Sequence, residues 1–292
     1  METWISFTLL AIVMQSVRTA GQKQIAQKIS PQAATLVRYL FGLPFAIAYF
    51  AWLQDDFQLA QLNSTFLLSS SLAAIAQIVA TVLLIKALGI KNFAVGTALA
   101  KTEAILTALI GTLFFSAILS PWGYLSVVLG VAGVLVASNW KISAADLTAN
   151  RSIKFGLGAG LGFALASLWI RQASLSLGLD GIVNAATVLV FMVGLQTLLC
   201  LIWVVLFESE QLPLIVKNFR ASLFIGVTSV LGSIGWFTAM SLQEAALVKT
   251  LGQAEFLVTL LITTFYFSEK ISLREVIGIA LIAVSVAMLI KA

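Results

Sequence analysis

The chain contains no histidine and only one cysteine, Cys200, among its 292 residues. A single cysteine cannot form a disulfide within the chain, and the nitrogen and sulfur ligands of a typical zinc site are missing. No phosphate-cradling loop of a nucleotide site is present either. We therefore expect no metal site and no cofactor.

Charged residues are scarce as well. They make up 10% of the chain, whereas roughly 25% is usual in a soluble domain. Hydrophobic residues make up 60%, and the mean hydropathy is +1.04. This composition predicts an all-α membrane protein that resides in the lipid bilayer. The net charge is +5, but the cations lie mostly in short loops, so we expect no nucleic-acid partner.

Long apolar runs predict the number of membrane spans. A transmembrane helix needs about 20 apolar residues, and ten such runs occur, separated by short polar breaks. We expect spans over residues 4–26, 32–53, 66–88, 93–116, 121–139, 154–177, 182–206, 220–241, 246–267 and 273–290. No positively charged segment of the kind found in cleavable signals precedes the first run, so we expect it to remain a helix. Pro44 lies inside a run and should kink the second helix.

A spacing of 152 residues relates the two halves of the chain. Glu103 and Glu255 are separated by it, and many of their neighbours recur at the same distance. Recurring pairs include Thr107 and Thr259, Phe115 and Phe267, Ser120 and Ser272, and Leu129 and Leu281. The chain is therefore an internal duplication. We expect one repeat over residues 1–140, a linker loop over 141–153 and a second repeat over 154–292.

The odd number of helices in each repeat determines how the halves are arranged. After five helices the chain has changed sides of the membrane, so the second repeat enters with the opposite orientation. Such inverted repeats are typical of secondary transporters. We expect ten transmembrane helices as two inverted five-helix repeats around a central cavity, which opens alternately to the two sides.

Most lysines and arginines lie in or beside the odd-numbered loops. These cations are Lys23, Lys28, Lys91, Lys141, Arg151, Lys154, Lys217, Arg220, Lys270 and Arg274. By the positive-inside rule these loops face the cytoplasm and both termini lie outside. We expect a multi-pass protein of the plasma (inner) membrane, as a monomer or homodimer.

One segment resembles a known family. The stretch Phe267-Ser268-Glu269-Lys270-Ile271-Ser272, followed by Val276-Ile277-Gly278 and an apolar helix, is similar to the end of the EamA repeat of the drug/metabolite transporter superfamily. The first repeat has Phe115-Ser116-Ala117 there and lacks the glutamate. The resemblance implies a small-molecule exporter or exchanger with a central cavity. It also implies cytosolic termini, in contrast to the loop charges.

Glu103 and Glu255 are the foremost candidate site residues. Both fall near the middle of a predicted span, where an ionised side chain costs about 2.5–3.5 kcal/mol and normally faces a cavity or a partner. Each could bind a cationic group of a substrate or take up a proton. The structural alternative is that each pairs permanently with a buried cation.

Two lysines and a glutamine accompany these glutamates. Lys101 is two residues before Glu103, hence about 200° away around a helix, so we expect the two to serve different neighbours. Lys249 and Gln253 are four residues apart and share a helix face that could hold an anionic group. The alternative for Lys249 is that it snorkels to the membrane surface.

Arg18 and Arg171 are nearly equivalent cations in the first helix of each repeat. With Gln15 on the same helix as Arg18, they could bind a carboxylate or phosphate bidentately. Alternatively, they neutralise the glutamates. Arg38 has no counterpart, because Val190 stands at its position in the second repeat, and a scaffold role is favoured. Trp236 could line the substrate site or simply pack in the core.

These residues favour secondary active transport of a small polar or zwitterionic metabolite, such as an amino acid. The buried glutamates would be proton or amine sites, and protons are a candidate coupling ion. Alternatives are efflux of lipophilic cations and transport of an anionic or phosphorylated metabolite. We do not expect an enzyme, because recognisable catalytic machinery is missing.

Overall fold

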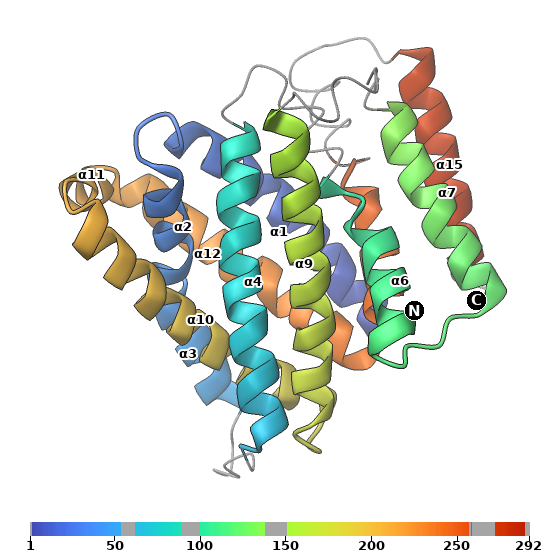
Figure 1. The fold of residues 1–292 in the computed structure, drawn as a ribbon, viewed down its shortest axis with the longest axis horizontal. Coiled ribbons are helices and arrows are strands. Elements are labelled where there is room, and N and C mark those ends of the chain that lie inside the picture. The colour runs from blue at the N-terminus through green and yellow to red at the C-terminus, as the bar shows by residue number, and fades with distance from the viewer. Residues whose placement is uncertain are drawn as a thin grey trace.

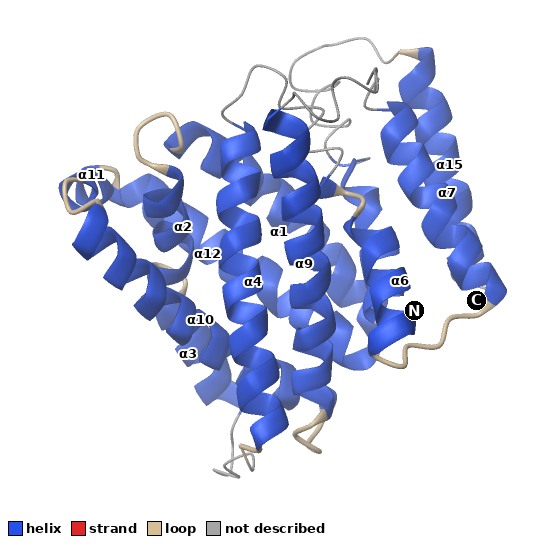
Figure 2. Ribbon diagram, viewed as in Figure 1, coloured by secondary structure: helices blue, strands red, loops and turns tan. Residues whose placement is uncertain are grey.

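The computed structural model describes residues 2–53, 62–88, 100–137, 151–256, 258 and 272–289. Within these ranges every regular element is a helix, which confirms the all-α prediction for this part of the chain (Figure 2). The helices are α1 (Thr3–Ile25), α2 (Pro31–Leu40), α3 (Leu43–Leu53), α4 (Ser64–Leu88), α6 (Glu103–Phe114), α7 (Pro121–Ala137), α9 (Arg151–Leu175), α10 (Gly181–Phe207), α11 (Gln211–Lys217), α12 (Phe219–Leu242), α13 (Ala245–Leu251), a 3-10 turn (Gly252–Ala254) and α15 (Leu273–Leu289).

Five helical segments of the described residues are long and apolar enough to cross a membrane. They are Pro31–Leu53, Ser64–Ala87, Ile153–Leu175, Gly181–Phe207 and Phe219–Leu242. Helix α1 has 23 residues, but Gln15 and Arg18 lower its hydropathy. Two of the predicted spans, 93–116 and 246–267, overlap only short helices, and both run into stretches outside the described residues. The structure is thus that of an integral, multi-pass membrane protein.

Prolines determine where the second span begins and where it breaks. Ser30 caps α2 by accepting a hydrogen bond from the Ala33 amide at 3.0 Å, and Pro31 occupies the first turn, where its missing amide proton costs nothing. Pro44 stands in the first turn of α3, after the interruption at residues 41–42. The helix is thus interrupted close to the place where the kink was predicted, because a proline ring cannot continue the α2 hydrogen-bond pattern.

The helices pack as equivalent pairs drawn from opposite halves of the chain. Shifting α1 by 152 residues superposes its range on α9, and the same shift takes α4 to α12. In the bundle α1 packs on α12 and α4 packs on α9, so the two pairs are equivalent (Figure 1). Each half therefore builds its core against the other half and not alone.

Helices α7 and α15 make a contact that shows how the halves are related (Figure 1). A Cβ atom on Gly278 would lie 2.6 Å from the Gly133 carbonyl oxygen, and the Ser285 hydroxyl donates to the Ser126 carbonyl at 2.7 Å. At the 152-residue spacing Ser126 corresponds to Gly278, and Gly133 to Ser285. Exchanging the two halves therefore turns each of these contacts into the other. The equivalent helices α7 and α15 run in opposite directions, as inverted repeats require.

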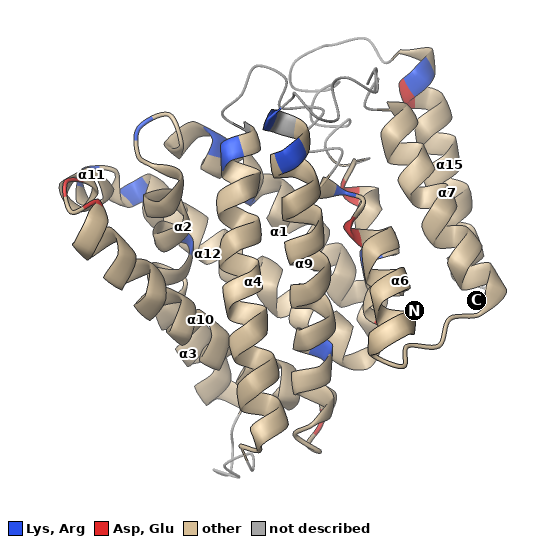
Figure 3. Cartoon of the chain, in the orientation of Figure 1, with Lys and Arg blue, Asp and Glu red and all other residues tan. Residues whose placement is uncertain are grey.

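Lysine and arginine collect at one end of the bundle, where α4 ends and where α9 and α15 begin (Figure 3). The termini of α1 and α15 nearest the chain ends lie toward the opposite end (Figure 1). The described residues thus give the bundle one basic end.

We expect Gly278→Ala to lower the free energy of unfolding by about 1–3 kcal/mol, because the added methyl would overlap the α7 backbone. Thermal unfolding of the purified protein measures this loss. The matched control is Gly194→Ala in α10, where a Cβ meets nothing within 4 Å. Equal melting temperatures for the two variants would contradict the close α7–α15 contact.

Candidate functional site

Each half of the chain interrupts a helix at the same place. Residues 101–102 form a turn before α6 begins at Glu103, and the 3-10 turn at 252–254 separates α13 from Glu255. The two interruptions correspond at the 152-residue spacing. Broken helices at equivalent positions of two repeats are typical of substrate sites in secondary transporters, because they release backbone and side-chain polar groups inside the bundle. Both glutamates stand at these breaks.

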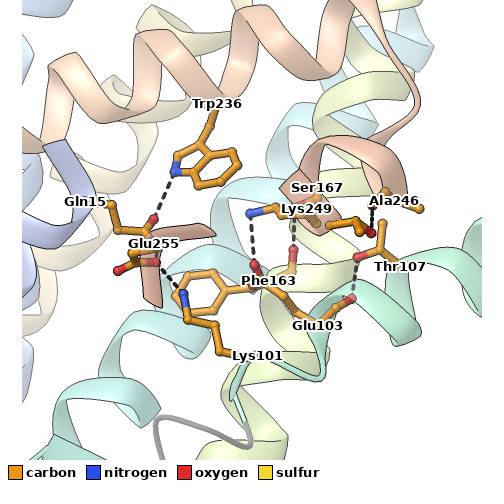
Figure 4. A network of polar contacts seen from close by, with 11 residues as sticks. Gln15, Lys101, Glu103, Thr107, Phe163, Ser167, Trp236, Ala246, Lys249 and Glu255 are labelled. Carbon is orange, nitrogen blue, oxygen red and sulfur yellow. Dashed lines mark hydrogen bonds and ion pairs between the residues drawn. The ribbon is translucent and has the colours of Figure 1, made fainter. Parts of the chain in front are cut away.

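Two ion pairs connect the breaks across the halves (Figure 4). Lys101 of the first half pairs with Glu255 of the second, and the Lys249 Nζ lies 3.3 Å from Glu103 Oε1. The expectation that Lys101 and Glu103 serve different neighbours is confirmed. Lys249 does not snorkel to the surface, because its side chain is only 8% exposed.

Gln15 and Trp236 tie two further helices to these pairs (Figure 4). The Gln15 amide nitrogen donates to Glu255 Oε2 at 2.7 Å, and the Trp236 indole donates to the Gln15 carbonyl oxygen at 2.9 Å. The Lys249 Nζ lies 4.3 Å from the centre of the Trp236 ring, a cation–π contact. Trp236 is thus a polar participant and not merely core. We call this set the Lys–Glu network: Gln15, Lys101, Glu103, Trp236, Lys249 and Glu255.

Gly252 permits the close approach of the Trp236 ring. A Cβ at this position would lie 2.5 Å from the ring, too near for any other residue without movement. Sequence reasoning missed Gly252. The available signal was a glycine inside an apolar helical pattern, which often marks a close approach.

Gln253 completes the surroundings of the network. Its side chain is buried, and neither amide atom has a hydrogen-bond partner among the described residues. An unsatisfied buried amide costs about 1–3 kcal/mol, so a bound polar group would stabilise it. The small space at the centre is bordered by Gln15, Lys101, Glu103, Trp236, Lys249, Gly252 and Gln253. It has no room for a water molecule in this conformation, so the ion pairs must separate before a ligand enters.

The structure gives the two equivalent arginines different surroundings. Arg171 donates to the Met240 and Gln243 carbonyls at 2.9 and 2.7 Å and pairs with Glu244 at 2.8 Å. These contacts fasten the end of α12 to the start of α13, so a substrate role for Arg171 stays a prediction without support from its contacts. Arg18 is buried and lies within electrostatic range of Glu255.

Among the described residues, no group of three or more cysteine, aspartate and glutamate side chains is placed to hold a metal ion. The arrangement instead offers two carboxylates, two ammonium groups, an indole and two amides within one buried region. Such a set can recognise charge of both signs in a ligand.

We expect Gly252→Ala to displace Trp236 and to lower the free energy of unfolding by about 1–3 kcal/mol. In a Trp236→Leu background the same substitution should cost less, because the ring that it meets is gone. Thermal unfolding of the four proteins in this cycle measures the difference. An equal cost in both backgrounds would show that the two residues do not constrain each other.

Comparison with known proteins agrees with this architecture. The model of the EamA-like transporter family matches residues 2–139 and 150–291. No curated protein matches the chain significantly. A solved structure described as "Crystal structure of protein" is similar in fold, with a TM-score of 0.76 and 17% sequence identity over 98% of this chain and 95% of that one. Because one family's repeat matches twice and covers nearly the whole sequence, the chain belongs to the EamA-like transporter family.

Proposed function

We propose that this protein is a secondary active transporter of a small zwitterionic metabolite, such as an amino acid or a related compound. One observation carries the proposal: at the two helix breaks, each glutamate pairs with a lysine of the other half. The family to which the chain belongs is one of transporters, which agrees with this proposal.

The charge balance of the Lys–Glu network favours a zwitterion. Two glutamates and two lysines sum to no net charge, and a low-dielectric region strongly disfavours any charge left over. A zwitterion could insert its ammonium group at a carboxylate and its own carboxylate at a lysine, so every charge keeps a partner. A lipophilic cation that paired with one glutamate would leave a buried lysine without its counter-charge. The network therefore disfavours efflux of such drugs.

Alternating access follows from where the pairs lie. Because both ion pairs join one half to the other, movement of one half against the other separates them and frees all four charged groups. We propose ten membrane spans in two inverted repeats, 1–140 and 154–292, that exchange conformations around this point. Glu103 and Glu255 then serve as amine or proton sites, and Trp236 covers the organic part of the substrate.

We propose export or exchange across the plasma (inner) membrane, with protons as the coupling ion. The basic end of the bundle would face the cytoplasm, which places both termini outside (Figure 3). The protein would act as a monomer or homodimer.

In proteoliposomes, Glu103→Gln and Glu255→Gln should each reduce uptake of the zwitterion that most stabilises the wild-type protein in an amino-acid thermal-shift screen. We expect a loss of about 10–100-fold, because each substitution removes one charge-assisted contact. Glu275→Gln, at an exposed helix start outside the network, is the matched control. Wild-type uptake rates for both network variants would refute the proposal.

A paired variant separates function from folding. Lys101→Gln with Glu255→Gln removes both charges of one ion pair, so neither member of that pair is left without its partner and the fold should persist. We expect a melting temperature close to that of the wild type but a loss of zwitterion uptake. Uptake at the wild-type rate in this folded variant would mean that the pair is only a structural link.

A further inference from the structure

Two arginines outside the Lys–Glu network are buried in the bundle. Arg18 on α1 is 4% exposed and Arg38 on α2 is 5% exposed. A guanidinium group does not lose its proton in ordinary conditions, so each brings a full positive charge into an apolar region. Buried charges in proteins are normally paired or neutralised.

The contacts of the Arg38 side chain are with neutral groups. Arg38 donates to the Thr81 hydroxyl at 2.9 Å, and its guanidinium lies 5.2 Å from the centre of the Tyr39 ring. Neither arginine takes part in an ion pair between described residues. Arg38 therefore has a hydrogen-bond acceptor, but among the described residues neither positive charge has a counter-charge of its own.

Three donor atoms in this region have no acceptor among the described residues. They are Arg18 Nε, Arg38 Nε and the side-chain nitrogen of Gln22, which stands one turn after Arg18 on α1. Gln22 is only 2% exposed, so solvent does not satisfy it. Unpaired buried donors are costly, and a group of them lacking acceptors indicates an electronegative ligand.

Helix α12 brings the two arginines to the same part of the bundle. Each stands one turn before a glycine that packs on residues 225–226 of α12, Gly21 for Arg18 and Gly42 for Arg38. Because Ile225 and Gly226 are consecutive, the two arginines stand beside the same turn of α12. An anion bound near both would offset the repulsion of two like charges in an apolar interior.

The network does not supply that anion. Its two glutamates already face two lysines, and Glu255 also accepts a hydrogen bond from Gln15. Arg18 feels the field of Glu255, but it shares that carboxylate with Lys101. Among the described residues, the charged groups of the two regions together thus carry two positive charges more than negative ones.

We propose that Arg18, Arg38 and Gln22 form a binding site for an oxyanion, a carboxylate or phosphate group. A guanidinium presents two parallel N–H donors that match two oxygens of such a group, which chloride cannot imitate. The bound oxyanion accepts from the unpaired donors and neutralises the excess charge. This site goes beyond the zwitterion site of the proposed function and does not depend on it.

The test uses the purified full-length protein in nanodiscs of neutral phosphatidylcholine, so that anionic lipid does not compete. Thermal unfolding is followed against sodium phosphate, sodium acetate and sodium chloride at matched ionic strength. We expect a saturable rise in melting temperature with phosphate, acetate or both, and none with chloride. Phosphate alone identifies a phosphate group as the ligand, and acetate alone identifies a carboxylate.

Arg18→Gln and Arg38→Gln should each raise the dissociation constant of the stabilising anion by about 10–100-fold. Without the anion, neither variant should melt below the wild type, because each removes an uncompensated charge. Lys86→Gln, which changes a lysine in the last turn of α4, should bind like the wild type. The paired Lys101→Gln and Glu255→Gln variant should also keep anion binding, which distinguishes failure of this site from failure of the zwitterion site.

Two results would overturn the site. One is an equal response of the wild type to phosphate, acetate and chloride. The other is wild-type anion affinity in the Arg18→Gln and Arg38→Gln double variant. If the glutamine variants cannot be purified, the anion affinity of Arg18→Lys and Arg38→Lys is measured in their place. Lysine keeps the positive charge but loses the two parallel N–H donors of the guanidinium group, so we expect weaker binding. Undiminished affinity in both lysine variants would likewise exclude the site.

Discussion

Ionised side chains inside an apolar bundle need counter-charges, and this requirement shapes the centre of the molecule. Here the counter-charges come from the opposite half of the chain: Lys101 meets Glu255, and Lys249 meets Glu103. The helix breaks, the hydrogen bond from Gln15 and the position of Trp236 all serve this pairing. Because both pairs join one half to the other, the fold depends on the same contacts that the proposed transport would have to separate.

Duplication explains the glutamates but not the lysines. Glu103 and Glu255 are equivalent, whereas Gln253 stands where the first half has Lys101, and Thr97 stands where the second half has Lys249. Each carboxylate still obtains one ammonium group, by two different routes. The two ends of the network are therefore chemically unlike, and a substrate bound as proposed would have a preferred direction. The two halves of the network thus have equivalent backbones but different side chains.

The sequence predicts much of the fold, because apolar runs and turn residues act locally. Pro44 marks the break between α2 and α3, and the 152-residue spacing predicts equivalent helices. The site was predictable in its members, since a buried Glu103 or Lys249 is costly wherever it lies. Its connections were not: the approach of Trp236 to Gly252 and the attachment of Arg171 to the α12–α13 junction join residues far apart in sequence. Only tertiary packing determines such contacts.

The contact between α7 and α15 has a consequence for the origin of the chain. Gly133 against Gly278 and Ser285 against Ser126 are the same contact after exchange of the halves, which is the defining property of an isologous interface. A separate protein made of one half and carrying this surface could have bound a second copy of itself, turned over in the membrane. After fusion into one chain, the two copies no longer had to share one sequence. A serine now stands where the other copy keeps glycine, and a lysine where the other has glutamine.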